Sequence, residues 1–167
     1  MWIRTETEAD HAAIDAVLAA AFAGAPGHGE VERRIVRALR AAGALTLSLV
    51  ADIDGRVAGH VAFSPVAIGD AAGWYGLGPL AVAPADQGHG VGGALVRAGL
   101  VELERLRAAG CVVLGDPGYY GRFGFAVRPG LRYPGVPSEY FMALPLDEHA
   151  MLPQGEARYH AAFAAAG

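Results

Sequence analysis

Cysteines, clustered cations and charge in general are scarce in this 167-residue sequence, and each shortage excludes a class of protein. Cys111 is the only cysteine, so no disulfide can form within the chain, and a reducing compartment is expected. Charged residues make up 18% of the sequence, and the formal net charge is −4. A nucleic-acid surface needs clustered cations, so the sequence predicts no nucleic-acid partner. The one local concentration of arginines has helical spacing and is interpreted as a solvated helix face: Arg33, Arg34, Arg37 and Arg40.

Signals for membranes, secretion and metals are missing as well. The apolar stretch 16–25 is too short to span a bilayer and follows the charged Asp15. The first residues lack the charged start and apolar run of a signal peptide. The six histidines show no metal-ligand spacing, so no metal is expected. We therefore predict a cytoplasmic protein without a membrane partner.

Apolar residues, in contrast, make up 53% of the sequence, which is enough for a substantial core. Their spacing predicts one mixed α/β domain over residues 1–167, with its elements in the order β-α-α-β-β-β-α-β-α-β. Helices are predicted over 7–22, 30–42 and 90–106, with a short helical turn over 117–122. Strands are predicted near Ile3 and over 45–51, 56–64, 74–83, 111–114 and 140–144.

Turn residues and prolines divide the strands. Asp54-Gly55 predicts a hairpin turn. Pro65 is expected to end the strand that begins at Arg56. Pro79 lies inside a predicted strand, and proline has no N–H to donate to a neighbouring strand. We therefore expect a β-bulge or a sheet edge at Pro79.

A glycine-rich loop, Gln87-Gly88-His89-Gly90-Val91-Gly92-Gly93, follows the strand that ends at 82–84 and opens the long helix. Glycines let the backbone approach a ligand closely, and their successive N–H groups can point at an anion. The start of the helix adds a partial positive charge. The loop therefore predicts a binding site for a pyrophosphate.

Other interpretations of the loop fit less well. Gly88-x-Gly90-x-x-Gly93 matches the dinucleotide fingerprint, with Asp116 as the acid that would bind the ribose. That fingerprint normally follows the first strand of its fold, and too little chain follows here for a second nucleotide-binding half. A P-loop is excluded because no Gly-Lys-Ser/Thr follows the glycines. The structural alternative is a glycine-rich turn that only lets the helix pack on a strand.

Gln87-x-x-Gly90-x-Gly92 resembles the Q/R-x-x-G-x-G/A signature of the GCN5-related N-acetyltransferase (GNAT) superfamily. The preceding Leu80-Ala81-Val82-x-Pro84 is similar to the fourth strand of that family. The run from Leu114 to Phe125 and Ser64-Pro65-Val66 resemble one bacterial branch, the YhbS-like acetyltransferases. The resemblance extends from the Ile3 strand to Phe163. It implies the GNAT acyl-CoA N-acyltransferase fold, a central twisted mixed sheet of about six or seven strands, splayed between the fourth and fifth and flanked by about four helices.

In that family acetyl-CoA binds in the gap between two parallel strands, which here would end near Val82 and Leu114. The resemblance implies that the pantetheine arm pairs with the backbone of 80–82 as an added strand does. It also implies that loop amides hold the pyrophosphate and that an N–H of 80–82 polarises the thioester carbonyl. The implied cofactor-binding residues are Leu80, Ala81, Val82, Gln87, Gly88, His89, Gly90, Val91, Gly92, Gly93, Tyr119 and Phe123.

Members of the family transfer the acetyl group directly to an amine, without an acyl-enzyme. Cys111 is therefore expected to be a core residue, whose apolar neighbours raise the pKa of its thiol. The family often protonates the leaving thiolate with a tyrosine of the short helix after the fifth strand. Tyr120 is the first candidate for this catalytic role here, and Tyr119 is the second. The general base stays open among three residues: Glu30, His60 and Ser64.

The resemblance implies an acetyl-CoA-dependent N-acetyltransferase whose acceptor is a small-molecule amine or a peptide. The loops that would shape the acceptor site, 25–30, 68–73 and 129–138, contain few charges, which argues against a highly charged polyamine. A catalytically silent acyl-CoA-binding or sensing domain is the alternative, because it would carry the same loop. Homodimers are common among relatives, so a second copy of the chain is a further candidate partner.

Overall fold

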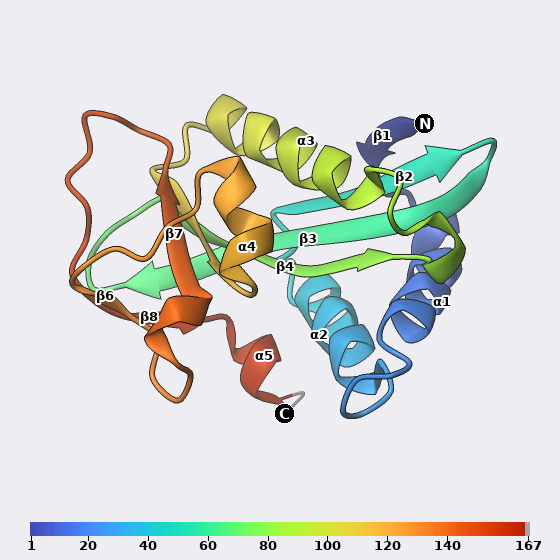
Figure 1. Ribbon diagram of the computed structural model, residues 1–167, viewed down its shortest axis with the longest axis horizontal. Helices are drawn as coiled ribbons and strands as arrows, with labels where there is room; N and C mark the ends of the chain where they lie inside the picture. The colour runs from blue at the N-terminus through green and yellow to red at the C-terminus, as the bar shows by residue number, and fades with distance from the viewer. Residues whose placement is uncertain (166–167) are drawn as a thin grey trace.

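The computed structural model describes residues 1–165, and its strands form a mixed sheet with helices on both faces (Figure 1). The final two residues of the predicted domain, 166–167, lie outside the described residues. The described helices are α1 (His11–Ala21), α2 (Glu30–Ala41), α3 (Val91–Arg105), α4 (Pro117–Tyr120) and α5 (Ala161–Ala165). The described strands are β1 (Trp2–Thr5), β2 (Leu47–Ile53), β3 (Arg56–Ile68), β4 (Trp74–Val82), β5 (Gly110–Leu114), β6 (Leu131–Arg132), β7 (Phe141–Pro145) and β8 (Gly155–Tyr159).

The strands follow the order β1-β2-β3-β4-β5-β7, while β8 pairs with the end of β3, and β6 pairs with β8. Along the main order, β4 and β5 run parallel, and the other neighbours run antiparallel. The β2–β3 hairpin turns at Asp54 and Gly55, whose φ angles of 54° and 80° are left-handed. The predicted hairpin turn and the predicted mixed α/β class are both confirmed.

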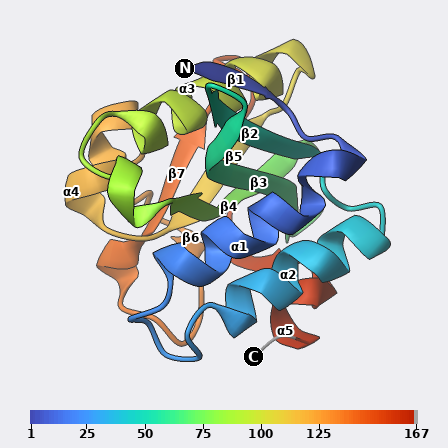
Figure 2. The same cartoon turned by 90° about the vertical axis from the view of Figure 1, so that its right-hand side faces the viewer.

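The helices cover the two faces of the sheet (Figure 2), and the longer ones, α1, α2 and α3, each bury one apolar stripe. On one face, Leu95 and Val96 of α3 share a buried core with Phe63 of β3. On the other face, Ile14 and Leu18 of α1 share a core with residues of β2 and β4. None of the helices described within 1–165 is long and apolar enough to cross a membrane.

A β-bulge interrupts β4 at Gly78–Pro79. Residues 61–63 of β3 lie opposite residues 77–80 of β4, so β4 carries one residue more than its partner over this stretch. The irregularity predicted at Pro79 is confirmed. Because a bulge bends its strand, it changes the direction in which β4 continues.

The two parallel strands separate where the bulge of β4 begins. β4 and β5 are paired as far as Leu77 and Val113. β4 then runs on to Val82, while β5 ends at Leu114. The last residues of β4 therefore have one edge that β5 leaves free, at the place where the sequence predicted a splayed pair.

The expectation that Pro65 ends its strand is wrong, because β3 continues to Ile68. The pairs of β3 with β2 stop at Phe63, and its pairs with β8 start at Val66. On that edge Pro65 stands between the two partners, so its missing N–H costs no hydrogen bond to β2 or β8, while on the other edge it lies opposite Tyr75 of β4.

The expectation that the strand at 140–144 is the last is also wrong, because β8 and α5 follow it. Only Ala157 of β8 is fully buried, and its neighbours Glu156 and Arg158 are exposed. Such a short strand with one buried residue carries too little apolar pattern to be recognised from sequence.

Candidate functional site

The glycine loop joins β4 to α3 and has the backbone shape of an anion site. Gly88 and Gly90 have φ angles of 78° and 84°, in the left-handed region that favours glycine. Gly90 caps α3, so the first amides of this helix have no carbonyl partner within it. Gln87 donates from Nε2 to the carbonyl oxygen of Val82 at 3.0 Å, which ties the loop to the end of β4. The loop can therefore present its N–H groups to an anion.

A cavity of about 450 Å³ lies along this loop and is called the loop cavity. The fold brings most of the predicted cofactor-binding residues together here. The loop cavity is lined by Val82, Asp86, Gln87, Gly88, Gly90, Val91, Gly92, Gly93, Tyr119 and Arg122.

The remaining predicted cofactor-binding residues lie elsewhere. Ala81 is buried on the α1 face of the sheet, and His89 is exposed. Phe123 packs beneath the guanidinium of Arg97, at 5.1 Å from its ring centre. Leu80 lines a second cavity.

Arg122 brings a positive charge to the loop cavity. Its guanidinium lies 4.3 Å above the ring centre of Tyr119 and 5.2 Å from that of Phe123, and its Nε donates to the carbonyl of Tyr119 at 3.1 Å. The acid in the lining, Asp86, is paired with Arg56 at 2.6 Å. Hydrogen bonds from Arg56 lower the pKa of Asp86, whose negative charge is compensated by this partner. Arg122 and the start of α3 therefore favour an anion in the cavity.

Tyr119 and Tyr120 are consecutive residues of α4 that open to different cavities. Tyr119 lines the loop cavity, where its hydroxyl oxygen lies 2.6 Å from the place that a Cβ on Gly92 would occupy. Tyr120 lines the second cavity. α4 follows Asp116, whose carboxylate caps the helix by accepting a hydrogen bond from Gly118 N at 2.9 Å. This capping role removes the support for Asp116 as a ribose-binding acid.

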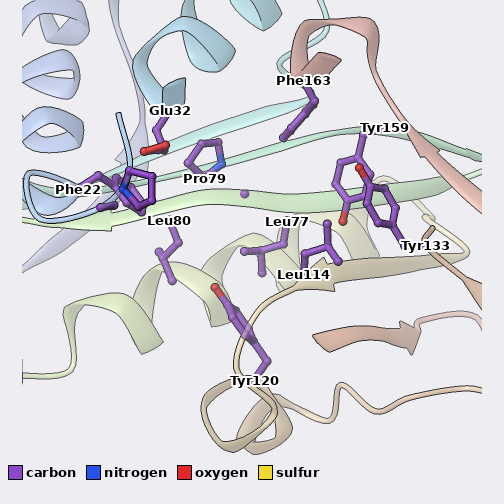
Figure 3. Close-up of a pocket in the computed structure, with 13 residues that line it drawn as sticks. Phe22, Glu32, Leu77, Pro79, Leu80, Leu114, Tyr120, Tyr133, Tyr159 and Phe163 are labelled. Carbon is purple, nitrogen blue, oxygen red and sulfur yellow. The ribbon is translucent and has the colours of Figure 1, made fainter. Parts of the chain in front are cut away.

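The second cavity, also about 450 Å³, opens where β4 and β5 separate and is called the sheet cavity (Figure 3). Its volume falls in the range of roughly 300–1,000 Å³ that is usual for small-molecule sites. The bulge of β4, the α1–α2 loop, α4 and the C-terminal elements enclose it. The sheet cavity is lined by Phe22, Ala25, Pro26, Glu32, Leu77, Gly78, Pro79, Leu80, Leu114, Tyr120, Tyr133, Tyr159 and Phe163.

The hydroxyl of Tyr120 points into the sheet cavity (Figure 3). The Tyr120 ring lies against Gly115, where any Cβ would overlap it, and it meets the Tyr119 ring edge-on at 4.9 Å. Burial raises the pKa of Tyr120 to about 12. A phenol with this pKa stays protonated at neutral pH, so Tyr120 can donate a proton to a group in the cavity.

The two glutamates at the start of α2 have different surroundings. Glu30, a predicted candidate base, is partly exposed and forms ion pairs with Arg33 at 3.4 Å and Arg34 at 2.9 Å. Glu32 lines the sheet cavity, and its buried Oε1 has no hydrogen-bond partner within the described chain. The fold therefore brings Glu32, and not Glu30, to the cavity that contains the Tyr120 hydroxyl.

His60 and Ser64, the other two candidate bases, are fully buried in β3. His60 Nε2 lies 2.8 Å from Ser48 Oγ, Ser48 donates to Glu6, and Arg40 pairs with Glu6 at 2.9 Å. Burial lowers the pKa of His60 to about 4. The sheet cavity, as the described residues define it, includes neither candidate.

Acidification from pH 6.5 to 4 is expected to destabilise the protein through His60. Its folded pKa of about 4 lies below its ordinary 6.5, so the unfolded state takes up the extra proton in this range. The stabilisation is complete above pH 6.5 and is lost as the pH falls toward 4. One such proton gives a slope of about 1.4 kcal/mol per pH unit in the free energy of unfolding. Denaturant titrations should show a shallower slope for His60→Asn, and equal slopes would contradict this assignment.

Cys111 is fully buried, and burial raises the pKa of its thiol, as the sequence predicted. A buried thiol with a raised pKa is a poor nucleophile, so Cys111 belongs to the core. The described residues contain no group of three or more His, Cys, Asp or Glu side chains that could hold a metal ion.

Two of the three loops expected to shape the acceptor site line the sheet cavity, 25–30 through Ala25 and Pro26 and 129–138 through Tyr133, whereas no residue of 68–73 is in its described lining. Sequence reasoning missed other residues of the two cavities: Glu32, Arg122, Tyr159 and Phe163. A signal existed for Glu32, which stands three and four residues before the buried Ile35 and Val36 and therefore shares their face of α2. Arg122 lies inside the run that carried the family resemblance. Tyr159 and Phe163 reach the sheet cavity only because the C-terminal segment folds back, and no local pattern indicates this.

Comparisons with known proteins agree with this geometry. A family model described as acetyltransferase (GNAT) domain matches residues 45–127. The chain is 38% identical to the uncharacterised N-acetyltransferase YhbS of Escherichia coli strain K12, over 98% of both chains. A crystal structure of a GNAT family acetyltransferase from Brucella melitensis in complex with acetyl-CoA is 52% identical, with a TM-score of 0.84 over 97% of each chain. The crystal structure of E. coli YhbS in complex with CoA is 39% identical, with a TM-score of 0.89 over 98% of this chain and 91% of that one. The chain therefore belongs to the GNAT superfamily of acetyltransferases, in its YhbS-like branch.

Proposed function

We propose that the protein is an N-acetyltransferase that moves an acetyl group from acetyl-CoA directly to an amine. The observation that carries this proposal is the separation of β4 from β5 between two cavities, one with an anion-binding loop and one with the Tyr120 hydroxyl. Val82 lines the first cavity and Leu80 the second, so the free edge of β4 connects them. The B. melitensis relative was solved with acetyl-CoA, which supports the same donor here.

The residues of the two cavities suit the successive parts of acetyl-CoA. The amides of 88–93 and the guanidinium of Arg122 suit its phosphates. The edge of β4 that β5 leaves free suits the pantetheine amides, which would add to it as a strand does. An N–H of 80–82 would stabilise the oxyanion that forms from the thioester carbonyl, an effect of about 3–4 kcal/mol per donor.

Acetyl-CoA supplies a thioester, whose carbonyl carbon forms a bond to the neutral amine nitrogen while its bond to sulfur breaks. The nitrogen loses one proton to solvent, and the sulfur gains one. Tyr120 is the catalytic residue that gives its hydroxyl proton to the sulfur, and it recovers a proton from solvent afterwards. The products are an N-acetylated amine and the free thiol of coenzyme A. Because the transfer is direct and forms no acyl-enzyme, the Cys111 thiol takes no part.

Gly92→Ala is expected to weaken the binding of coenzyme A about 10-fold, because overpacking a filled site costs about 1–3 kcal/mol. The new Cβ would lie 2.6 Å from the Tyr119 hydroxyl oxygen. In Gly92→Ala/Tyr119→Phe that oxygen is gone, and the nearest remaining atoms lie at 3.6 Å on Val82 and 3.8 Å on Tyr119. Calorimetric Kd values of both single variants and the double variant should therefore be non-additive. Strictly additive losses would show that these residues do not share space.

The proposed function is tested by mixing the protein with acetyl-CoA and a panel of amines, while a thiol-reactive dye and mass spectrometry follow free thiol and product. Thiol release that depends on an amine, with an acetylated product, supports the proposal. Thermal stabilisation by coenzyme A with no acetylated product from any amine would favour a silent acyl-CoA-binding domain instead. Absence of both stabilisation and product would overturn the coenzyme site as well.

A further inference from the structure

The sheet cavity contains one charged side chain among its described lining residues, the carboxylate of Glu32. The other lining residues are aliphatic, aromatic, glycine or proline, apart from the hydroxyls of three tyrosines. Figure 3 shows Glu32 beside Pro79 at one end of the cavity, with Tyr133 and Tyr159 at the other. The cavity therefore has one negative end and one aromatic end.

The Glu32 carboxylate is not paired with the arginines of its own helix. Arg33 and Arg37 bind Asp15 at 3.1 Å and 2.6 Å. Arg34 binds Glu30 at 2.9 Å, and Arg40 binds Glu6 at 2.9 Å. These four arginines pair with other acids, so the Glu32 carboxylate can pair with a cation that enters the sheet cavity.

The buried Oε1 of Glu32 has no hydrogen-bond partner among residues 1–165. Withdrawing a carboxylate oxygen from water without giving it a donor is costly. A cation that enters the cavity beside the Glu32 carboxylate would offset part of that cost by pairing with its charge. An alkylammonium group, which is the resting form of a primary amine at neutral pH, has this chemistry.

The aromatic end offers ring surface to an apolar body, although it also carries the hydroxyls of Tyr133 and Tyr159, of which that of Tyr159 is buried without a hydrogen-bond partner among the described residues. The Tyr159 ring meets the Tyr133 ring edge-on at 5.5 Å and the Phe163 ring at 5.0 Å, and each of the three lines the cavity. Gly76 makes this arrangement possible, because a Cβ there would lie 2.6 Å from the Tyr159 ring. Aromatic rings packed edge-to-face favour another flat, apolar group.

From these two ends we infer that the acceptor is a small primary amine with a single positive charge and an apolar, preferably aromatic, body. Glu32 binds its ammonium group, and the rings of Tyr133, Tyr159 and Phe163 bind its body. The ammonium must lose one proton to solvent before its nitrogen attacks the thioester as the neutral amine. A carboxylate on the acceptor would be repelled by Glu32, and a second ammonium would find no second acid in the described lining. This inference rests on the proposed acetyltransferase function and narrows it to a substrate class.

The test compares amines that differ by one feature each. 2-Phenylethylamine carries the predicted features, phenylalanine adds a carboxylate, phenylalanine amide keeps the added bulk without that charge, and spermidine replaces the ring with further cations. We expect kcat/KM to fall about 100-fold from 2-phenylethylamine to phenylalanine and to recover in part with the amide. Comparable rates for phenylalanine or spermidine would refute the acceptor class but keep the acetyltransferase function. No product from any amine would instead be the failure of the proposed function.

Glu32→Gln tests the binding residue itself. We expect it to lower kcat/KM for 2-phenylethylamine about 30-fold, mainly through KM, while the Kd of coenzyme A stays within about twofold. It should also reduce the discrimination against phenylalanine, a readout that loss of folding alone would not change. Glu30→Gln tests the competing glutamate, and Glu102→Gln, on α3, is the control for removing a surface charge. Wild-type selectivity in Glu32→Gln, or an equal loss in Glu30→Gln, would overturn the assignment.

Discussion

Replacing Tyr120 with phenylalanine is expected to lower kcat about 100- to 1,000-fold, the usual contribution of a general acid. The substitution removes one oxygen atom from the sheet cavity and keeps the ring that packs against Gly115. The departing sulfur would then leave as an unprotonated thiolate or take its proton from water. The Kd of coenzyme A should change less than about twofold, because Tyr120 lies outside the loop cavity. Steady-state kinetics and calorimetry measure the two quantities separately.

The matched control is Tyr140→Phe, which removes the hydroxyl of an exposed tyrosine away from both cavities. It should retain full turnover. A Tyr120→Phe enzyme with wild-type kcat would remove Tyr120 from the mechanism. A large rise in the Kd of coenzyme A would show instead that Tyr120 belongs to the donor site.

The second large effect is expected from Gly88→Ala/Gly90→Ala, which should raise the Kd of coenzyme A about 100-fold. Both glycines have left-handed φ angles, of 78° and 84°. An alanine in this region costs about 1–2 kcal/mol at each position, so the loop would shift to another backbone shape. The amides of the loop would no longer converge on the phosphates. The value of kcat at saturating acetyl-CoA should change much less, because the substitutions lie outside the sheet cavity.

Gly24→Ala and Gly121→Ala are the controls for replacing glycine with alanine. A Cβ at either position meets no atom within 4 Å, and neither residue has a left-handed φ. Both variants should bind coenzyme A as the wild type does. If the loop variant also kept its affinity, the glycine loop would not be the phosphate site.

Much of the fold could be predicted from the sequence because long elements repeat their apolar pattern several times. The helix that became α1 places Ile14, Val17 and Leu18 on one face, and these are its buried residues. Asp54-Gly55 and Pro79 act through local backbone geometry, so their effects could also be read locally. The formation of β8 and the continuation of β3 beyond Pro65 depend on which strands pair with each other. Such pairing joins residues far apart in the sequence, so local patterns do not predict it.

The two cavities differ in the same way. Most of the loop cavity lining comes from the backbone of one short segment, 82–93, so its glycines could be recognised directly, and only Tyr119 and Arg122 come from elsewhere. The sheet cavity is assembled from segments that meet only in the folded chain. Glu30 and Glu32 illustrate the difference, because two positions on a helix differ by about 200° in direction, at 3.6 residues per turn. Glu32 lies on the face of α2 that buries Ile35 and Val36, and this face indicates Glu32 instead of Glu30 as the glutamate of the cavity.

The unequal origin of the two cavities also bears on how such proteins diversify. The residues that line the loop cavity fall between Val82 and Arg122, whereas those of the sheet cavity extend from Phe22 to Phe163. Substitutions near either end of the chain can therefore alter the sheet cavity, the proposed acceptor site, while the loop cavity, the proposed donor site, stays unchanged. Homologues that descend from one ancestor could in this way share the same acyl donor and differ in the acceptors that they modify.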